Sequence, residues 1–203
     1  KSLVEGDVLI GLPSSGLHSN GFTLVRAVLD RSGLSLMEEC PFEANCDFRR
    51  IERFSDSVGV TLAEVLLNPT RIYVDPLVDL IAETRMEGGV CGPESIKALA
   101  HITGGGLSNL LRLHDSMGWH IDEPLTPQPE FKWISEVGGV SDLEMHRTFN
   151  MGMGMVVAVD QASANTISKW LNERLPGTRI VGHITSGDRV VTHSNPEVIF
   201  DKY

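Results

Sequence analysis

Two glycine-rich turns, each set between an apolar stretch and a helical pattern, constrain the fold of this chain most strongly. The first is Ser14–Gly21 after the apolar residues 8–12, and the second is Thr103–Gly106 after residues 96–102. Glycines let a backbone approach a ligand closely, and a helix start offers free N–H groups and a partial positive charge. The pattern predicts strand–turn–helix units whose turns meet a ligand with two phosphate-bearing parts, or two phosphorylated ligands.

Length and charge restrict the classes of function. The chain has 203 residues, 41% of them hydrophobic, and a net charge of −10 at pH 7. It is long enough for one good core, as a large single domain or a domain with a small lobe. Nonspecific nucleic-acid binding needs an excess of Lys and Arg. No apolar run approaches the roughly 20 residues of a membrane span, and no signal-peptide pattern is present. We therefore expect neither a nucleic-acid nor a membrane partner, and a cytoplasmic location.

Hydrophobic spacing predicts alternating strands and helices, with paired strands near the end. The expected strands are 7–13 (buried on both faces), 96–102, 119–121, 153–159, 179–184 and 190–192. The expected helices are 20–32, a short one over Leu62–Leu66, one from Asp75 through Ile81, 105–114, 131–137, one from Ser141, and one from Ala164 to near Pro176. Residues 33–55, 86–95 and 123–129 are expected to be irregular or loops. We infer an α+β fold, an α/β sandwich in which helices pack on a mixed β-sheet.

Capping signals predict several helix starts. Ser19 or Asn20 is the expected cap of the helix over 20–32. Asp75 is the expected cap of the helix that has Pro76 at its first position. Ser141 begins a capping box, with a glutamate three residues later.

The cysteines and carboxylates give no metal signature. Cys40, Cys46 and Cys91 form no Cys-x-x-Cys pair, and we interpret them as free thiols in a reducing compartment, with a Cys40–Cys46 disulfide as the alternative. Histidine spacing does not favour a zinc site made by protein ligands alone, and no Mg²⁺ ligand stands out among the 27 acidic residues.

The first turn combines hydroxyl, amide and imidazole groups with glycine. Its candidate phosphate- or substrate-binding residues are Ser14, Ser15, Gly16, Ser19, Asn20 and Gly21. The alternative is an ordinary capped helix after a tight turn. The turn lacks both the Walker ending and the dinucleotide-binding glycine pattern.

The second turn holds the consecutive glycines Gly104, Gly105 and Gly106 after Thr103, and we predict that all four residues bind ligand. Each glycine at a helix start costs about 1 kcal/mol relative to alanine, which favours a functional reason over a structural one. His18 and His101 stand beside the two turns and are the candidate catalytic residues, to orient a substrate or shuttle a proton. The five other histidines are expected at surface or satisfied core positions.

Two further residues have both a binding and a structural interpretation. Arg71 follows a helix end and either clamps a phosphate or caps that helix. Asn150 precedes a strand with alternating glycines, where close backbone approach is expected, and is a candidate polar ligand.

Four blocks occur in the order found in one enzyme family. They are Gly11–Arg26, Leu67–Tyr73, Ala100–Leu107 and Arg147–Met155. Together they resemble aminoimidazole ribonucleotide synthetase, also called phosphoribosylformylglycinamidine cyclo-ligase. The resemblance implies that residues 1–203 form the C-terminal domain of a two-domain synthetase. The N-terminal domain, which carries much of the ATP and metal site and the dimer contacts, is then absent, so we expect the isolated chain to be inactive.

The resemblance also implies a reaction. ATP, with Mg²⁺, activates the formyl amide oxygen of formylglycinamidine ribonucleotide; the neighbouring amine closes the imidazole ring, and ADP and phosphate leave. His18 or His101 then polarises the amide or accepts a proton, and the intact protein is a homodimer. The alternatives are another ATP-dependent synthetase of this superfamily, of the selenophosphate or formylglycinamidine type, or a non-catalytic ribonucleotide-binding module.

Overall fold

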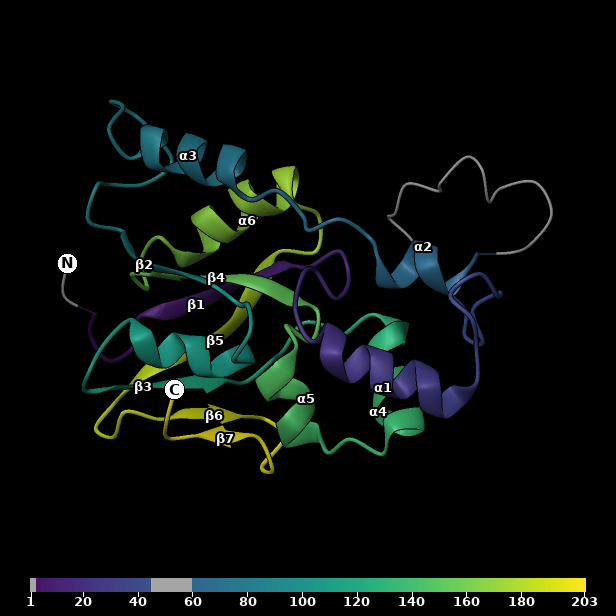
Figure 1. Cartoon of the computed structure of the whole chain (residues 1–203). Coiled ribbons are helices and arrows are strands. Elements are labelled where there is room, and N and C mark those ends of the chain that lie inside the picture. Colours follow the sequence, from purple (N-terminus) through teal and green to yellow (C-terminus); the bar gives the residue numbers. More distant parts are fainter. Residues whose placement is uncertain (1–2, 45–59) are drawn as a thin grey trace.

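One seven-stranded sheet organises the chain (Figure 1). A computed structural model describes residues 3–44 and 60–203. The strand order is β2-β4-β1-β5-β3-β6-β7, in which β3 and β6 run parallel and the other neighbouring pairs run antiparallel. The mixed sheet with packed helices confirms the predicted α+β class.

The predicted elements are found with small shifts at their ends. The strands are β1 (Val8–Pro13), β2 (Ile96–His101), β3 (Met117–Ile121), β4 (Met153–Val159), β5 (Arg179–Ser186), β6 (Val191–His193) and β7 (Ile199–Phe200). The helices are α1 (Phe22–Ser32), α2 (Leu62–Leu66), α3 (Val74–Glu83), η2 (Gly106–Arg112), α4 (Pro129–Gly138), α5 (Asp142–Thr148) and α6 (Ala164–Arg174). The two-residue β7 is an addition, too short to leave an alternating pattern in the sequence.

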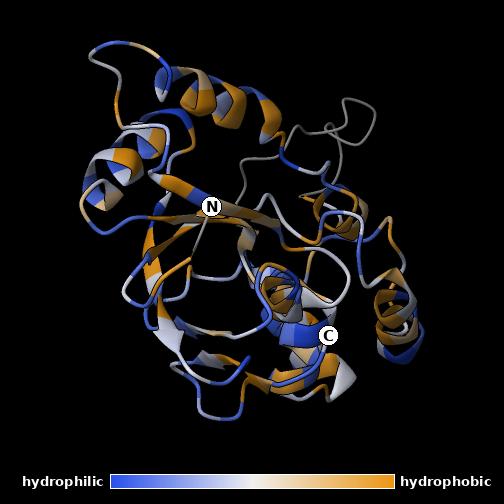
Figure 2. Ribbon diagram, turned by 90° about the vertical axis from the view of Figure 1, so that its left-hand side faces the viewer, coloured by the Kyte–Doolittle hydropathy of each residue, from blue (hydrophilic) through white to orange (hydrophobic). Residues whose placement is uncertain are grey.

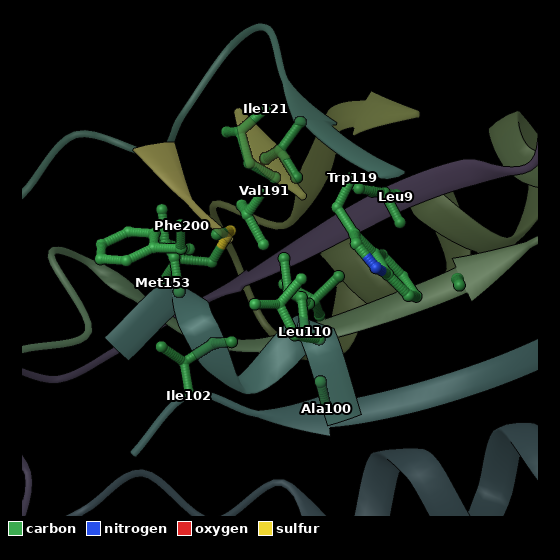
Figure 3. Close-up of a cluster of buried hydrophobic side chains, with 14 of the residues drawn as sticks. Leu9, Ala100, Ile102, Leu110, Trp119, Ile121, Met153, Val191 and Phe200 are labelled. Carbon is green, nitrogen blue, oxygen red and sulfur yellow. The ribbon is translucent and has the colours of Figure 1, made fainter. Parts of the chain in front are cut away.

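The sheet has a hydrophobic cluster on each face. Leu9 of β1 belongs to the cluster that includes η2, whereas its neighbour Ile10 belongs to the cluster with α3 and α6. Successive side chains of a strand point to opposite faces, so β1 is buried on both sides as predicted. Figure 1 shows α3 and α6 over one face. In Figure 3 the side chains of Leu9, Leu110 and Trp119 gather in the cluster on the other face.

The remaining helices form a third cluster beyond one end of the sheet. Residues of α1, α2, α4 and α5 pack together there, and the rings of Phe131 and Phe149 lie 5.7 Å apart between centroids. In Figure 2 the helix ribbons carry both hydrophobic and hydrophilic stretches, as expected where one face is buried. This cluster supports the loop that follows β1.

Two of the predicted helix caps are wrong, and the third is confirmed. Gly21, with a φ of 76°, is the N-cap of α1, and no side chain caps this helix. The Ser19 hydroxyl instead lies beside the Thr70 hydroxyl, and the side-chain carbonyl of Asn20 accepts a hydrogen bond from the N–H of Gly104 in another loop. Asp75 lies inside the first turn of α3, because this helix begins one residue earlier, at Val74. There its negative charge still interacts favourably with the positive end of the helix dipole. The Ser141 hydroxyl caps α5 as predicted.

The helix predicted over 105–114 is found as a 3₁₀ helix, Gly106–Arg112. The left-handed glycines at its start lead into tight i→i+3 turns rather than an α-helical turn. Residues 33–44 contain an isolated bridge, Glu39 with Thr61, and 86–95 contain neither helix nor strand. Cys46, with the alternative disulfide, and residues 45–55 of the predicted irregular stretch lie outside the described residues. In the described ranges, 3–44 and 60–203, no helix has the length and apolarity to cross a membrane.

Candidate active site

The two glycine turns form one site. Strands β1 and β2 both pair antiparallel with β4, so they run in the same direction and end at the same edge of the sheet. The Asn20 side-chain carbonyl, in the turn after β1, accepts a 2.8 Å hydrogen bond from the N–H of Gly104, in the turn after β2. The rings of His18 and His101 lie 6.5 Å apart between centroids. The structure thus brings together segments 84 residues apart.

Tyr73 and Gly154 bring the other two sequence blocks to the same place. The Tyr73 ring lies 6.1 Å from His18 and 6.0 Å from His101 between centroids, and its hydroxyl donates to the Pro13 carbonyl at 2.9 Å. A Cβ on Gly154 would lie 2.0 Å from the Tyr73 hydroxyl oxygen and 2.8 Å from Cε1 of His18. The glycine in strand β4 therefore marks a close approach of side chains to the backbone, as the alternating glycines predict.

His18 has the most unusual environment in the site. Its φ is 58°, and its side chain is 4% exposed. Nε2 accepts hydrogen bonds from the N–H of Ser15 at 3.1 Å and of Arg71 at 3.5 Å, so the ring proton belongs on Nδ1. Within the described part of the chain, Nδ1 is buried and has no hydrogen-bond partner. A buried donor without a partner is costly and indicates a position where a ligand or water oxygen fits.

The histidines of the site are uncharged at neutral pH. Burial, followed by the nearby His101 and the Arg71 guanidinium, lowers the pKa of His18 to about 4. Burial also lowers the pKa of His101. Burial raises the pKa of Tyr73, against a lowering by Arg71, so this hydroxyl stays protonated. The site therefore combines neutral donors and acceptors with one guanidinium, Arg71, which lies near enough to shift both His18 and Tyr73.

Internal hydrogen bonds hold the first turn in place. Ser14 exchanges two bonds with Gln128: the Gln128 amide donates to the Ser14 carbonyl at 2.7 Å, and the Ser14 hydroxyl donates to Oε1 at 3.3 Å. The Ser15 hydroxyl donates to the Pro69 carbonyl, and the Asn150 amide donates to the Gly16 carbonyl at 2.8 Å. The Asn68 amide donates to the Ser15 carbonyl. In the structure, Ser14, Ser15 and Asn150 therefore hold the turn in place, and their predicted contact with ligand stays a prediction.

The second turn is shaped by packing as well as by its place in the site. The N–H of Gly106 donates to the Thr103 carbonyl at 2.8 Å, and a Cβ on Gly106 would lie 1.8 Å from the carbonyl oxygen of His146. Gly105 has a φ of 101°, which disfavours other residues. Packing and backbone conformation therefore explain why two of the three positions, 105 and 106, hold glycine, and Gly104 is the one that faces Asn20. The predicted ligand contacts of Thr103 and the three glycines stay predictions.

The five other histidines occupy surface or satisfied positions, as predicted. His120 and His183, on β3 and β5, both bond to Asp122, at 2.9 and 2.8 Å. His146 is buried with Nδ1 bonded to a backbone carbonyl, and His114 and His193 accept bonds from backbone N–H groups. Among the described residues, no group of three His, Cys, Asp or Glu side chains is suited to a metal ion.

Sequence reasoning missed four residues that shape the site. Tyr73, Asn68 and Gln128 are ordinary residues in helix links, and Glu130 lies on a helix whose pattern shows only its apolar face. Their role depends on which loops meet in space, which no local pattern encodes. Tyr73 and Asn68 do lie in the block Leu67–Tyr73 that carries the family resemblance, and this was the available signal.

Comparisons with known proteins give a consistent result. The family described as "AIR synthase related protein, C-terminal domain" matches residues 4–194. A phosphoribosylformylglycinamidine cyclo-ligase of Methanopyrus kandleri is 40% identical over 188 residues, which cover 93% of this chain and 46% of that protein. The chloroplastic/mitochondrial enzyme of that name from Vigna unguiculata is 43% identical over 193 residues, covering 94% and 43%. The chain thus spans about half the length of the curated relatives that it matches.

Solved structures support the fold alone. A crystal structure of hydrogenase maturation protein HypE matches with a TM-score of 0.53 at 16% sequence identity and covers 98% of this chain and 52% of that one. A structure of HypE from E. coli matches with a TM-score of 0.51 at 18% identity, covering 95% and 47%. At these identities the likeness concerns the arrangement of strands and helices.

Proposed function

This chain belongs to the C-terminal domain family of AIR synthase related proteins, and from this premise we propose that it supplies part of a site for ring closure. The proposed reaction converts formylglycinamidine ribonucleotide to aminoimidazole ribonucleotide, with ATP consumed and ADP and phosphate released, in purine biosynthesis. The observation that carries the proposal is the buried, unpartnered Nδ1–H of His18 where the two glycine turns meet. The relatives named as cyclo-ligases support the same reading.

We propose that His18 binds the amide oxygen of the substrate through Nδ1–H. The Ser15 and Arg71 N–H groups occupy Nε2, which fixes the tautomer in which Nδ1 donates. Because the ring is neutral, Nδ1–H orients the amide oxygen without transferring a proton to it, and the oxygen keeps a lone pair with which to attack phosphorus. A pre-placed donor in a buried position loses little solvation when the substrate binds.

His101 is the proposed proton acceptor. It lies at the end of β2, more exposed than His18, and its lowered pKa leaves it neutral with a free lone pair. When the amine nitrogen attacks the activated carbon, that nitrogen gives up a proton as phosphate leaves. A neutral imidazole within reach of this nitrogen takes the proton. The guanidinium of Arg71 is proposed to bind phosphate oxygens beside it.

ATP and Mg²⁺ stand as proposals of a different kind. The Arg71 cation and the backbone N–H groups of the glycine turns suit the oxygens of a phosphate. The described residues offer no group of three metal-ligating side chains, so we assign no Mg²⁺ ligand to this chain. We propose that the half of the protein that the relatives have in addition completes the ATP and Mg²⁺ site, and that the intact protein is a cytoplasmic homodimer.

The test is ADP release by the full-length protein with Mg²⁺ and formylglycinamidine ribonucleotide. We expect His18→Asn, which tolerates the left-handed backbone, to lower kcat/KM by about 100-fold, the effect of losing the group that positions the reacting oxygen. His114→Asn, outside the site, is the matched control and should change it less than about twofold. If both variants keep wild-type kcat/KM, His18 has no role in catalysis.

Two other proposals give different results in the same assay. A synthetase for another acyl or selenium substrate releases ADP only with that substrate. A non-catalytic module binds the ribonucleotide without releasing ADP. We favour ring closure, because the relatives named above carry the cyclo-ligase name over more than 90% of this chain.

A further inference from the structure

A buried carboxyl group lies directly behind the first glycine turn. Glu130, the second residue of α4, is 4% exposed. A Cβ built on Gly16 would lie 2.9 Å from Oε1 of Glu130, so the carboxyl group touches the backbone of the turn two residues before His18. The turn has a left-handed φ of 131° at Gly16, and only glycine fits between the carboxyl group and this backbone.

The start of α4 holds this turn at a second point. Gln128, the N-cap of α4, bonds both the carbonyl and the hydroxyl of Ser14. Glu130 and Gln128 thus contact the turn at Gly16 and Ser14. Since the N–H of the intervening Ser15 donates to Nε2 of His18, a movement of the turn also moves the imidazole contact.

Within residues 3–44 and 60–203, no cation forms an ion pair with Glu130. Burial raises the pKa of Glu130 to about 7, against a lowering by a hydrogen bond with its own backbone. Of the charged groups on the helices packed here, Glu64 of α2 accepts from Thr61, Arg31 of α1 donates to the Gly138 carbonyl, and Glu144 and Arg147 of α5 pair with each other. Arg26 and Asp30 of α1 are exposed.

We propose that Glu130 is a positioning residue of the site, whose uncharged carboxyl group keeps the Gly16 turn and His18 in the ligand-binding arrangement. A carboxylate that is buried against the backbone of a glycine, with no paired cation among the described residues, has lost most of the water that would stabilise its charge. Ionisation therefore displaces the turn, and with it Ser15 and the imidazole of His18. The substrate that the turn binds rests on the proposed function, but the movement of the turn does not.

The first arm of the test follows the chain itself by nuclear magnetic resonance. We expect the backbone amide signals of Gly16 and His18 to titrate with a midpoint near the pKa of Glu130, about 7. Glu130→Gln, which keeps the shape without the charge, should remove this titration. Glu136→Gln, an exposed glutamate of the same helix paired with Lys132, is the control and should keep it. A titration that persists in Glu130→Gln, or is absent at both residues in the wild type, overturns the proposal.

The second arm measures kinetics of the full-length protein with formylglycinamidine ribonucleotide. On this proposal, only the protein with Glu130 uncharged binds the ribonucleotide, so the wild-type KM should rise about tenfold between pH 6 and pH 8. Glu130→Gln should keep a constant KM over this range and a similar kcat. If the amide titration appears but KM stays flat, Glu130 moves the turn without positioning the site, and the proposal fails. If no ADP is released, the proposed function fails, and the amide titration alone decides the movement. Should Glu130→Gln not fold, the wild-type titration of Gly16 decides it.

Discussion

Replacing Gly154 by alanine should destabilise the chain through the site rather than through the sheet. The new Cβ would lie 2.0 Å from the Tyr73 hydroxyl oxygen and 2.8 Å from Cε1 of His18, both far inside contact distance. Overpacking of this kind costs about 1–3 kcal/mol, and losing the Tyr73 bond to the Pro13 carbonyl costs about 0.5–1.5 kcal/mol more. Alanine recovers about 0.5–1 kcal/mol of backbone entropy. We expect a net loss of about 2–3 kcal/mol.

The assay is thermal unfolding of the chain at pH 7.5. For a domain of this size, the expected loss lowers Tm by about 4–12 °C. Gly92→Ala is the matched control, because its nearest outside atom is the Ser95 hydroxyl at 3.9 Å and its φ is not positive. Gly92→Ala should change Tm by less than about 2 °C. A Gly154→Ala protein that is as stable as Gly92→Ala would refute the packing of Tyr73 and His18 against β4.

Two further predictions concern pH and the contact between the turns. The pKa of His18 is lowered from 6.5 to about 4, so its contribution to stability is present above pH 6.5 and is lost as the pH falls toward 4. At most about 3 kcal/mol of the free energy of unfolding is lost this way. In urea unfolding, the free energy of His18→Asn should fall less steeply with decreasing pH than that of the wild type between pH 6.5 and 4. Parallel pH dependences of the two proteins would contradict the lowered pKa of His18. Asn20→Ala removes the acceptor for the Gly104 N–H and should raise KM of the full-length protein more than it lowers kcat. Steady-state kinetics with both constants unchanged would show that the joined turns do not serve binding.

The local elements were largely predictable from the sequence. The continuous apolar run of β1 and the glycines after it mark a buried strand and a turn, because these depend on neighbouring residues alone. The cap of α1 was mispredicted because it depends on a residue that is distant in the sequence. Asn20 is a good capping residue, but its carbonyl is engaged by Gly104 from another part of the chain, and tertiary contact overrides the local preference.

The assembly of the site depends on strand order, which local patterns do not carry. His18 and His101 were predicted beside separate turns, and they come together because β4 lies between β1 and β2. The two histidines also differ in ways that only burial reveals: His18 is a buried donor with a fixed tautomer, whereas His101 lies at an exposed strand end. Glu130 left no signal in the sequence, since one acidic residue in the first turn of a helix is ordinary.

The most direct test of the central claim is ADP release by the full-length protein with Mg²⁺, ATP and formylglycinamidine ribonucleotide, compared with the same mixture without the ribonucleotide. The account predicts ADP in equal amount to aminoimidazole ribonucleotide, only when the ribonucleotide is present, and greatly reduced in His18→Asn. ADP release that does not depend on the ribonucleotide, or an undiminished rate in His18→Asn, would contradict it.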